Sequence, residues 1–74
     1  MQEKFSKYYK IISDNIKSLR LKTGLSQEKF AEKIGCSREY ISRLENYHEV
    51  ASLDFILNLT MLFDLEPESF FKNN

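Results

Sequence analysis

The sequence predicts an all-α fold, a single small domain of five helices over residues 1–74. Three observations support this fold class. Apolar residues recur along the chain at three- and four-residue spacing, which is the pattern of amphipathic helices. The 74 residues include two Gly and one Pro, less turn material than a strand-rich fold of this length needs. Charged residues at 30% and hydrophobic residues at 42% fit a globular domain rather than a disordered chain.

The first helix is expected over residues 3–23. Its apolar stripe consists of Phe5, Tyr8, Tyr9, Ile12, Ile16 and Leu19. Gly24 is the natural end, because glycine readily takes the left-handed conformation that closes a helix. Ser13 could instead cap a later start. Residues 1–11 therefore form either the first turns of this helix or a separate extension that packs on the core or at a dimer interface.

Two short helices and a tight turn follow. Ser26 is placed to cap the second helix, which ends at Gly35. One residue separates that glycine from Ser37, a cap for a third helix over residues 38–45. Two helices joined in this way over residues 27–45 form a helix-turn-helix.

The rest of the chain is expected to form a loop and two further helices. The loop covers residues 46–51, and Ser52 then caps a fourth helix over residues 53–63. Pro67, at a first helical position, opens a short fifth helix through Phe71.

Charge is distributed unevenly, although the formal net charge is zero. Residues 1–43 carry ten Lys and Arg against five Asp and Glu, whereas residues 44–74 carry one Lys against six acids. A basic half facing a polyanion and an acidic half facing away is one interpretation. The other interpretation is that both halves are ordinary solvated surfaces. Charge alone does not decide between these two interpretations.

Several classes of function find no support in the sequence. No apolar run approaches the roughly 20 residues that span a bilayer, and the N-terminus lacks the apolar stretch of a signal peptide. A single cysteine, Cys36, favours a reducing cytoplasm; we expect a small buried hydrophobe there, with a redox sensor as the alternative. His48 is expected to be exposed. Because no metal site, cofactor motif or catalytic constellation is visible, we expect neither an enzyme nor a bound cofactor.

The stretch QEKFAEKIGCSREYISRL, residues 27–44, closely resembles the helix-turn-helix of the lambda-repressor/Cro-like (Xre) family. The shared features are a glutamine opening the second helix, the small Ala31, the turn Gly35, and Ile41 and Leu44 in the third helix. The similarity extends over about residues 12–71. It implies a five-helix lambda-repressor-like fold, DNA binding through the third helix and a two-fold dimer.

Two details refine this resemblance. The short length, the YIS sequence and the terminal ESFF are similar to controller proteins of restriction–modification systems, while phage repressors carry much of the same sequence. The family often has a glycine and then basic residues after the Glu-Asn that ends the third helix. Here Tyr47, His48 and Glu49 follow Asn46, which places a phosphate clamp from this loop in doubt.

The third helix carries the residues expected to read bases. If Ile41 and Leu44 point inward, four residues cluster on the opposite side; these are Arg38, Glu39, Ser42 and Arg43. An arginine can fork onto the O6 and N7 atoms of a guanine, and a glutamate can accept from a cytosine N4 or orient a neighbouring arginine. The alternative is a solvated helix face on which Glu39 pairs with Arg43.

Other residues are expected to contact phosphate or to hold the fold. The resemblance implies a phosphate contact for the side chain of Gln27, and the further phosphate candidates are Ser37, Tyr40 and Asn46. It also implies a structural ion pair between Arg20 and Glu45. Exposed lysines would add attraction without sequence preference.

The fourth helix is apolar on all sides. A single small domain cannot bury that much apolar surface by itself. The family fold buries Leu53, Ile56, Leu59, Thr60 and Phe63. The residues left for a dimer interface are Phe55, Met61, Leu62, Phe70 and Phe71. The alternative is a monomer in which the N-terminal extension folds over this surface.

The sequence therefore predicts a cytoplasmic homodimer that binds a palindromic DNA site and regulates transcription. No membrane, cofactor or small-molecule ligand is expected. The rival interpretation is a protein-interaction module, antitoxin-like or an anti-repressor, that keeps the fold without binding an operator. Zero net charge favours the rival, and the two outward arginines of the third helix oppose it.

Overall fold

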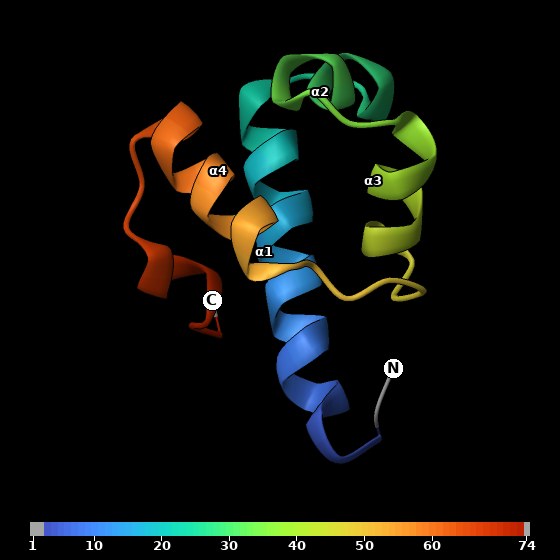
Figure 1. The fold of residues 1–74 in the computed structure, drawn as a ribbon, viewed down its shortest axis with the longest axis vertical. Helices are drawn as coiled ribbons and strands as arrows, with labels where there is room; N and C mark the ends of the chain where they lie inside the picture. The colour runs from blue at the N-terminus through green and yellow to red at the C-terminus, as the bar shows by residue number, and fades with distance from the viewer. Residues whose placement is uncertain (1–2, 74) are drawn as a thin grey trace.

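The computed structural model describes residues 3–73, and every regular element in that range is helical. The elements are a 3-10 turn η1 (Glu3–Phe5), the helices α1 (Ser6–Thr23), α2 (Gln27–Ile34), α3 (Arg38–Glu45) and α4 (Leu53–Phe63), and a second 3-10 turn η2 (Pro67–Phe70), all visible in Figure 1. The first two residues of the expected extension lie outside the described residues. Within the described part of the chain, no helix is long and apolar enough to cross a membrane.

Short-range signals fix the helix ends where the sequence predicts them. The hydroxyl groups of Ser26, Ser37 and Ser52 each accept a hydrogen bond, at 3.1 Å, from the backbone amide three residues on. Gly24 and Gly35 end α1 and α2 with φ of 76° and 90°. The later start for the first helix is wrong, because Ser13 lies inside α1.

Two expected elements differ: the first helix begins at Ser6 after the 3-10 turn η1, and the fifth helix is absent as an α-helix, so residues 3–73 contain four α-helices rather than five helices. Residues 67–70 form a 3-10 turn, in which the amides of Ser69 and Phe71 bond to carbonyls three residues back. The Ser69 hydroxyl also donates to the Glu66 carbonyl at 2.7 Å, and Asn15 of α1 binds the Phe70 carbonyl at 2.9 Å. The two Ser69 bonds occupy the Glu66 carbonyl, which would accept from the amide of Phe70 in an α-helix.

The core lies where all four helices and η2 meet. Ile16 of α1, Phe30 of α2 and Leu59 of α4 have no exposed surface. Phe30 also stacks on Phe63 with ring centroids 5.8 Å apart. In Figure 1, α1 runs through the middle of the molecule with α3 on one side and α4 and η2 on the other. This arrangement buries the inner side of α3 and leaves its outer side free.

The N-terminal extension does not cover α4. Its described residues continue α1 past the body of the domain, as the blue end of the ribbon in Figure 1 shows. Phe5 and Tyr8 are 40% and 57% exposed. Among the residues that the structure describes, the extension therefore does not cover the apolar side of α4, and the alternative of a monomer folded in that way is wrong.

Candidate nucleic-acid interface

Helix α3 is fixed in place by the residues that the sequence placed inward. Ile41 and Leu44 have no exposed surface. On the opposite side Arg38, Glu39 and Arg43 are exposed, while Ser42 is half-buried. The four residues expected to read bases therefore share the outer side of one helix, which is the geometry that lets a helix enter a major groove.

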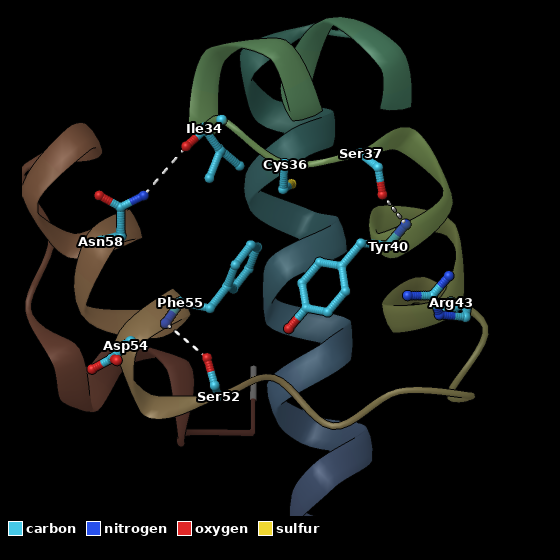
Figure 2. Close-up of a pocket in the computed structure, with 10 residues that line it drawn as sticks. Ile34, Cys36, Ser37, Tyr40, Arg43, Ser52, Asp54, Phe55 and Asn58 are labelled. Atoms are coloured by element: carbon cyan, nitrogen blue, oxygen red, sulfur yellow. Dashed lines mark hydrogen bonds between the residues drawn. The ribbon is translucent and has the colours of Figure 1, made fainter.

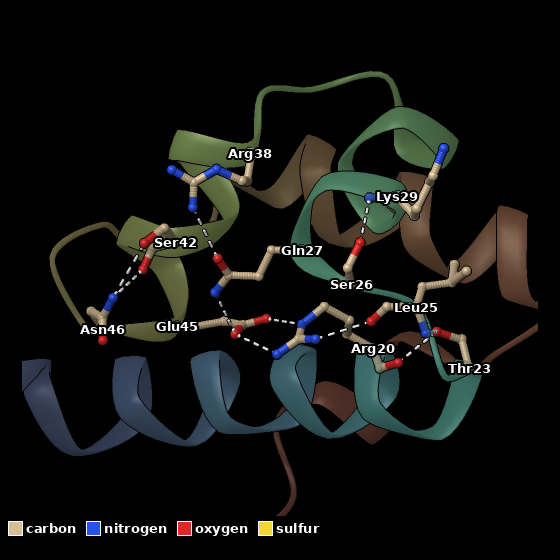
Figure 3. Close-up of polar contacts among 10 residues, drawn as sticks. All are labelled: Arg20, Thr23, Leu25, Ser26, Gln27, Lys29, Arg38, Ser42, Glu45 and Asn46. Carbon is tan, nitrogen blue, oxygen red and sulfur yellow. Dashed lines mark hydrogen bonds and ion pairs between the residues drawn. The ribbon is translucent and has the colours of Figure 1, made fainter.

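An ion pair beneath α3 joins it to α1. Arg20 donates from Nε to Glu45 Oε2 at 2.7 Å and from Nη2 to Oε1 at 3.0 Å, so the pair is bidentate (Figure 3). The side chains of Arg20 and Glu45 are 12% and 3% exposed. Arg20 also donates to the carbonyl of Leu25 at 3.0 Å, which ties the start of α2 to the same group. The family pattern implied this pair, and the structure contains it.

Gln27 extends this ion pair to the surface of α3. Its Nε2 donates to Glu45 Oε1 at 3.0 Å, and its Oε1 accepts from Arg38 Nη1 at 3.4 Å (Figure 3). The side chain expected on phosphate is therefore engaged inside the protein. In this position Gln27 holds Arg38, and only the remaining amide hydrogen is left for a phosphate.

The charge of Glu45 is stabilised within this network. Burial alone would raise the pKa of Glu45, but hydrogen bonds from Arg20 and Gln27 and the positive charges of Arg20 and Lys17 outweigh it and lower the pKa. Glu45 thus stays ionised and acts as an acceptor only. Its Oε1 receives Gln27 Nε2, which leaves Gln27 Oε1 to face Arg38.

Arg43 is held by a residue that sequence reasoning missed. Its Nε donates to Glu49 Oε1 at 3.1 Å, and its guanidinium carbon lies 5.8 Å from the centre of the Tyr40 ring. Arg43 thus pairs with Glu49 and not with Glu39, which was its partner in the alternative of a solvated helix face. The sequence signal for this partner was Glu49 itself, an acidic residue in the loop after Asn46, where the family often has basic residues.

Tyr40 packs beside Arg43 inside the domain, so the expected contact of its hydroxyl with phosphate finds no support in this geometry and stays a prediction. Its half-buried ring packs edge-to-face on Phe55 with centroids 5.2 Å apart. Its hydroxyl points toward the start of α4 near Ser52, as Figure 2 shows. Burial raises the pKa of Tyr40, partly offset by the Ser52 backbone. Phe55 is therefore partly buried inside the domain, and its assignment to a dimer surface stays a prediction.

Tyr40, Arg43 and Phe55 line an open groove between α3 and α4, which also contains Cys36 (Figure 2). Burial raises the pKa of the Cys36 thiol. A reactive cysteine requires a lowered pKa, so the structure gives no support to a redox sensor here. The half-buried thiol acts as a small packing residue.

The ends of α3 contain the other phosphate candidates. Ser37 caps the helix by accepting from the amide of Tyr40, which leaves its hydroxyl proton free to donate. Asn46 is exposed, and its Nδ2 donates to the carbonyl of Ser42 at 2.9 Å and to the Ser42 hydroxyl at 3.3 Å. Ser37 thus caps the start of α3 and Asn46 caps its end, and both side chains remain at the surface.

Tyr47 ties the loop after α3 to α1. Its φ is 65°, in the left-handed region where glycine is favoured, at the position where the family often has glycine. Its hydroxyl donates to the carboxylate of Asp14, and the ammonium of Lys10 lies 5.0 Å above its ring. These contacts stabilise a backbone conformation that is costly for a tyrosine.

The apolar surface on α4 differs from the expected one. Phe70 is 2% exposed and lies in the core, so its assignment to a dimer interface is wrong. Leu53, expected to be buried, is 64% exposed. The exposed apolar side chains on α4 and after η2 are Leu53, Leu57, Met61, Leu62 and Phe71. We call these five residues the apolar surface.

The comparisons with known proteins agree with this geometry. The helix-turn-helix family profile matches residues 16–70. The chain is 37% identical over 51 residues to a propionyl-CoA carboxylase regulator of Cereibacter sphaeroides, a match that covers 69% of this chain and 11% of that protein. It is 32% identical over 60 residues to YgzD, an uncharacterized HTH-type transcriptional regulator of Bacillus subtilis, and this match covers 81% of this chain and 91% of YgzD. No solved structure matches the chain significantly.

The fold and the outer side of α3 thus define a DNA-binding domain of the kind found in transcriptional regulators. The chain belongs to the helix-turn-helix family of the Xre, lambda-repressor-like type.

Proposed function

We propose that this protein is a sequence-specific transcriptional regulator that binds a palindromic operator as a homodimer, with α3 in the major groove. The single observation that carries the proposal is the pair of arginines on the outer side of α3. Two arginines stand there, Arg38 held by Gln27 and Arg43 held by Glu49. Arginines held in this way recognise guanine with two hydrogen bonds, each such contact being worth roughly 1–3 kcal/mol of discrimination.

Dimerisation follows from charge and from the apolar surface. A domain of zero net charge attracts phosphate weakly, so one copy would bind DNA with low affinity. Leu53, Leu57 and Met61 follow one another at four-residue spacing on the exposed side of α4, and Met61 is 82% exposed. Pairing this stripe with its copy would remove it from water and would present two α3 helices to half-sites about 34 Å apart.

The second candidate function is the protein-interaction module. Its support is the ion pair between Arg43 and Glu49, with side chains 50% and 35% exposed, since an arginine neutralised by its own chain attracts phosphate less. The loop over residues 46–51 also contains no Lys or Arg. A module of this kind would use the same fold to bind a protein partner.

Selection from a random duplex library at one fixed salt concentration tests the proposal. A regulator enriches a sequence with two inverted half-sites, and sedimentation at micromolar concentration gives twice the monomer mass. A library that stays random after repeated rounds would contradict sequence-specific binding. A strict monomer on sedimentation would contradict the homodimer.

A further inference from the structure

We propose that Glu49 is a specificity-determining residue that positions Arg43 for one base pair and lowers affinity for DNA in general. This inference rests on the proposed function and adds a residue outside the helix-turn-helix to it. Glu49 lies in the loop after α3, six residues beyond its partner, and its carboxylate binds the side of the guanidinium rather than its end.

The geometry leaves one end of Arg43 free to recognise a base. A guanidinium has five N–H groups in one plane, and Glu49 takes the hydrogen on Nε at 3.1 Å. Among the residues that the structure describes, the two Nη groups have no hydrogen-bond partner. These two groups form the fork that fits the O6 and N7 atoms of guanine. An arginine bound through Nε therefore approaches a guanine with its free end.

A second contact restricts the same guanidinium. The Tyr40 ring lies 5.8 Å from it, and Phe55 of α4 holds that ring in place. Arg43 is thus supported by the α3–α4 loop from one side and by the groove of Figure 2 from another. Restricting a flexible side chain before binding reduces the entropy lost on binding, which favours the one base that the fork fits.

The charge of Glu49 acts in the opposite direction on general affinity. A carboxylate at the edge of α3 repels the phosphates of any duplex, whatever its sequence. Arg38 offers an internal comparison, because the neutral Gln27 holds it without adding a negative charge. Discrimination is a difference between two affinities, so Glu49 can weaken binding to all sequences and still raise the preference for one.

The test measures binding of the full chain to the selected operator and to a scrambled duplex of equal length, at the same salt concentration. For Glu49→Ala, which removes both the charge and the acceptor oxygen, we expect binding to the scrambled duplex to tighten, while the operator-to-scrambled ratio falls about three- to tenfold. The loss should appear at the base pair where Arg43→Ala also loses discrimination. Glu49→Asp keeps the charge but is too short to reach Nε, so it should lower the ratio without tightening scrambled binding.

Matched variants separate positioning from repulsion. Asp54→Asn removes one negative charge from α4 beside the same groove, and it should leave the operator-to-scrambled ratio unchanged. In an Arg43→Ala background, Glu49→Ala should no longer change the ratio. Melting curves of each variant report whether the fold is intact.

Three results would overturn the inference. If Glu49→Ala tightens binding to both duplexes equally, the residue only repels DNA, and the proposed function stands without it. If Glu49→Ala lowers the ratio equally in the Arg43→Ala background, Glu49 does not act through Arg43. If the unaltered protein shows no preference for any sequence, the proposed function fails, and this inference falls with it.

Discussion

Gln27 connects the buried ion pair of the domain to the surface of α3, because it binds Glu45 through its nitrogen and Arg38 through its oxygen. The same side chain therefore serves the fold and the DNA-facing surface. Arg20, at the buried end of this chain of contacts, never needs to touch DNA to influence where Arg38 lies. Each link can be tested separately.

Arg20→Met should destabilise the domain by about 3–5 kcal/mol. The reason is that the Glu45 side chain, 3% exposed, would keep its charge without its principal partner. Urea unfolding followed by circular dichroism measures the change. Lys22→Met removes an exposed positive charge from the same helix and should change stability by no more than about 0.5 kcal/mol. Equal effects from the two substitutions would show that the ion pair contributes little.

The lowered pKa of Glu45 predicts that the domain loses stability as the pH falls. Its pKa is lowered in the folded state, because hydrogen bonds from Arg20 and Gln27 outweigh burial. A lowered folded pKa means that the unfolded chain takes up the proton more readily. The stabilisation is therefore fully present above the ordinary glutamate pKa of about 4.3, and it is lost as the pH falls through the folded pKa.

Glu45→Gln, compared with the unaltered protein by urea unfolding at a series of pH values, checks this contribution. The variant should be less stable at neutral pH, and the difference between the two proteins should shrink as the pH falls. A constant difference across the series would show that the ionisation of Glu45 is not linked to folding.

The left-handed backbone of Tyr47 predicts that an alanine at this position is less stable than a glycine. At φ of 65° an alanine keeps the unfavourable backbone conformation, whereas a glycine does not. Both lose the contacts with Asp14 and Lys10. Tyr47→Ala should therefore be less stable than Tyr47→Gly by about 1 kcal/mol, measured by thermal unfolding. An alanine variant as stable as the glycine variant would contradict the account of this loop.

The apolar surface predicts the behaviour of the dimer. Leu57→Lys places a charge in the middle of the stripe on α4, and it should weaken self-association at least about tenfold, as followed by sedimentation over a range of concentrations. Leu21→Lys is the matched control, since Leu21 is an exposed leucine of α1, 59% accessible and outside the stripe. If both substitutions weaken association equally, the dimer does not use this side of α4.

The sequence predicted those parts of the fold that depend on short-range signals. Serine caps and glycine ends act over three or four residues, so α2, α3 and α4 have their predicted bounds. The contact of η2 with α1 was harder to predict, because Asn15 is 55 residues from the carbonyl of Phe70 that it binds. Helical periodicity likewise does not reveal that Phe70 lies in the core while Phe71 is 49% exposed.

The candidate site divides in the same way. Counting along α3 identified Arg38 and Arg43, since a helix fixes which residues share a side. Counting did not identify their partners, because Gln27 and Glu49 approach from a different helix and from a loop. The contact of Tyr47 with Asp14 spans 33 residues and depends on a left-handed backbone that the residue type itself disfavours.

The double variant Arg38→Ala, Arg43→Ala tests the central claim most directly, by its binding to the selected operator at fixed salt. The account predicts that preference for the operator over a scrambled duplex falls by about a hundredfold, since two forked contacts are removed. It also predicts that the melting temperature and the sedimentation behaviour stay those of the unaltered protein. A double variant that folds, self-associates and still prefers the operator as strongly would contradict the claim that α3 reads DNA.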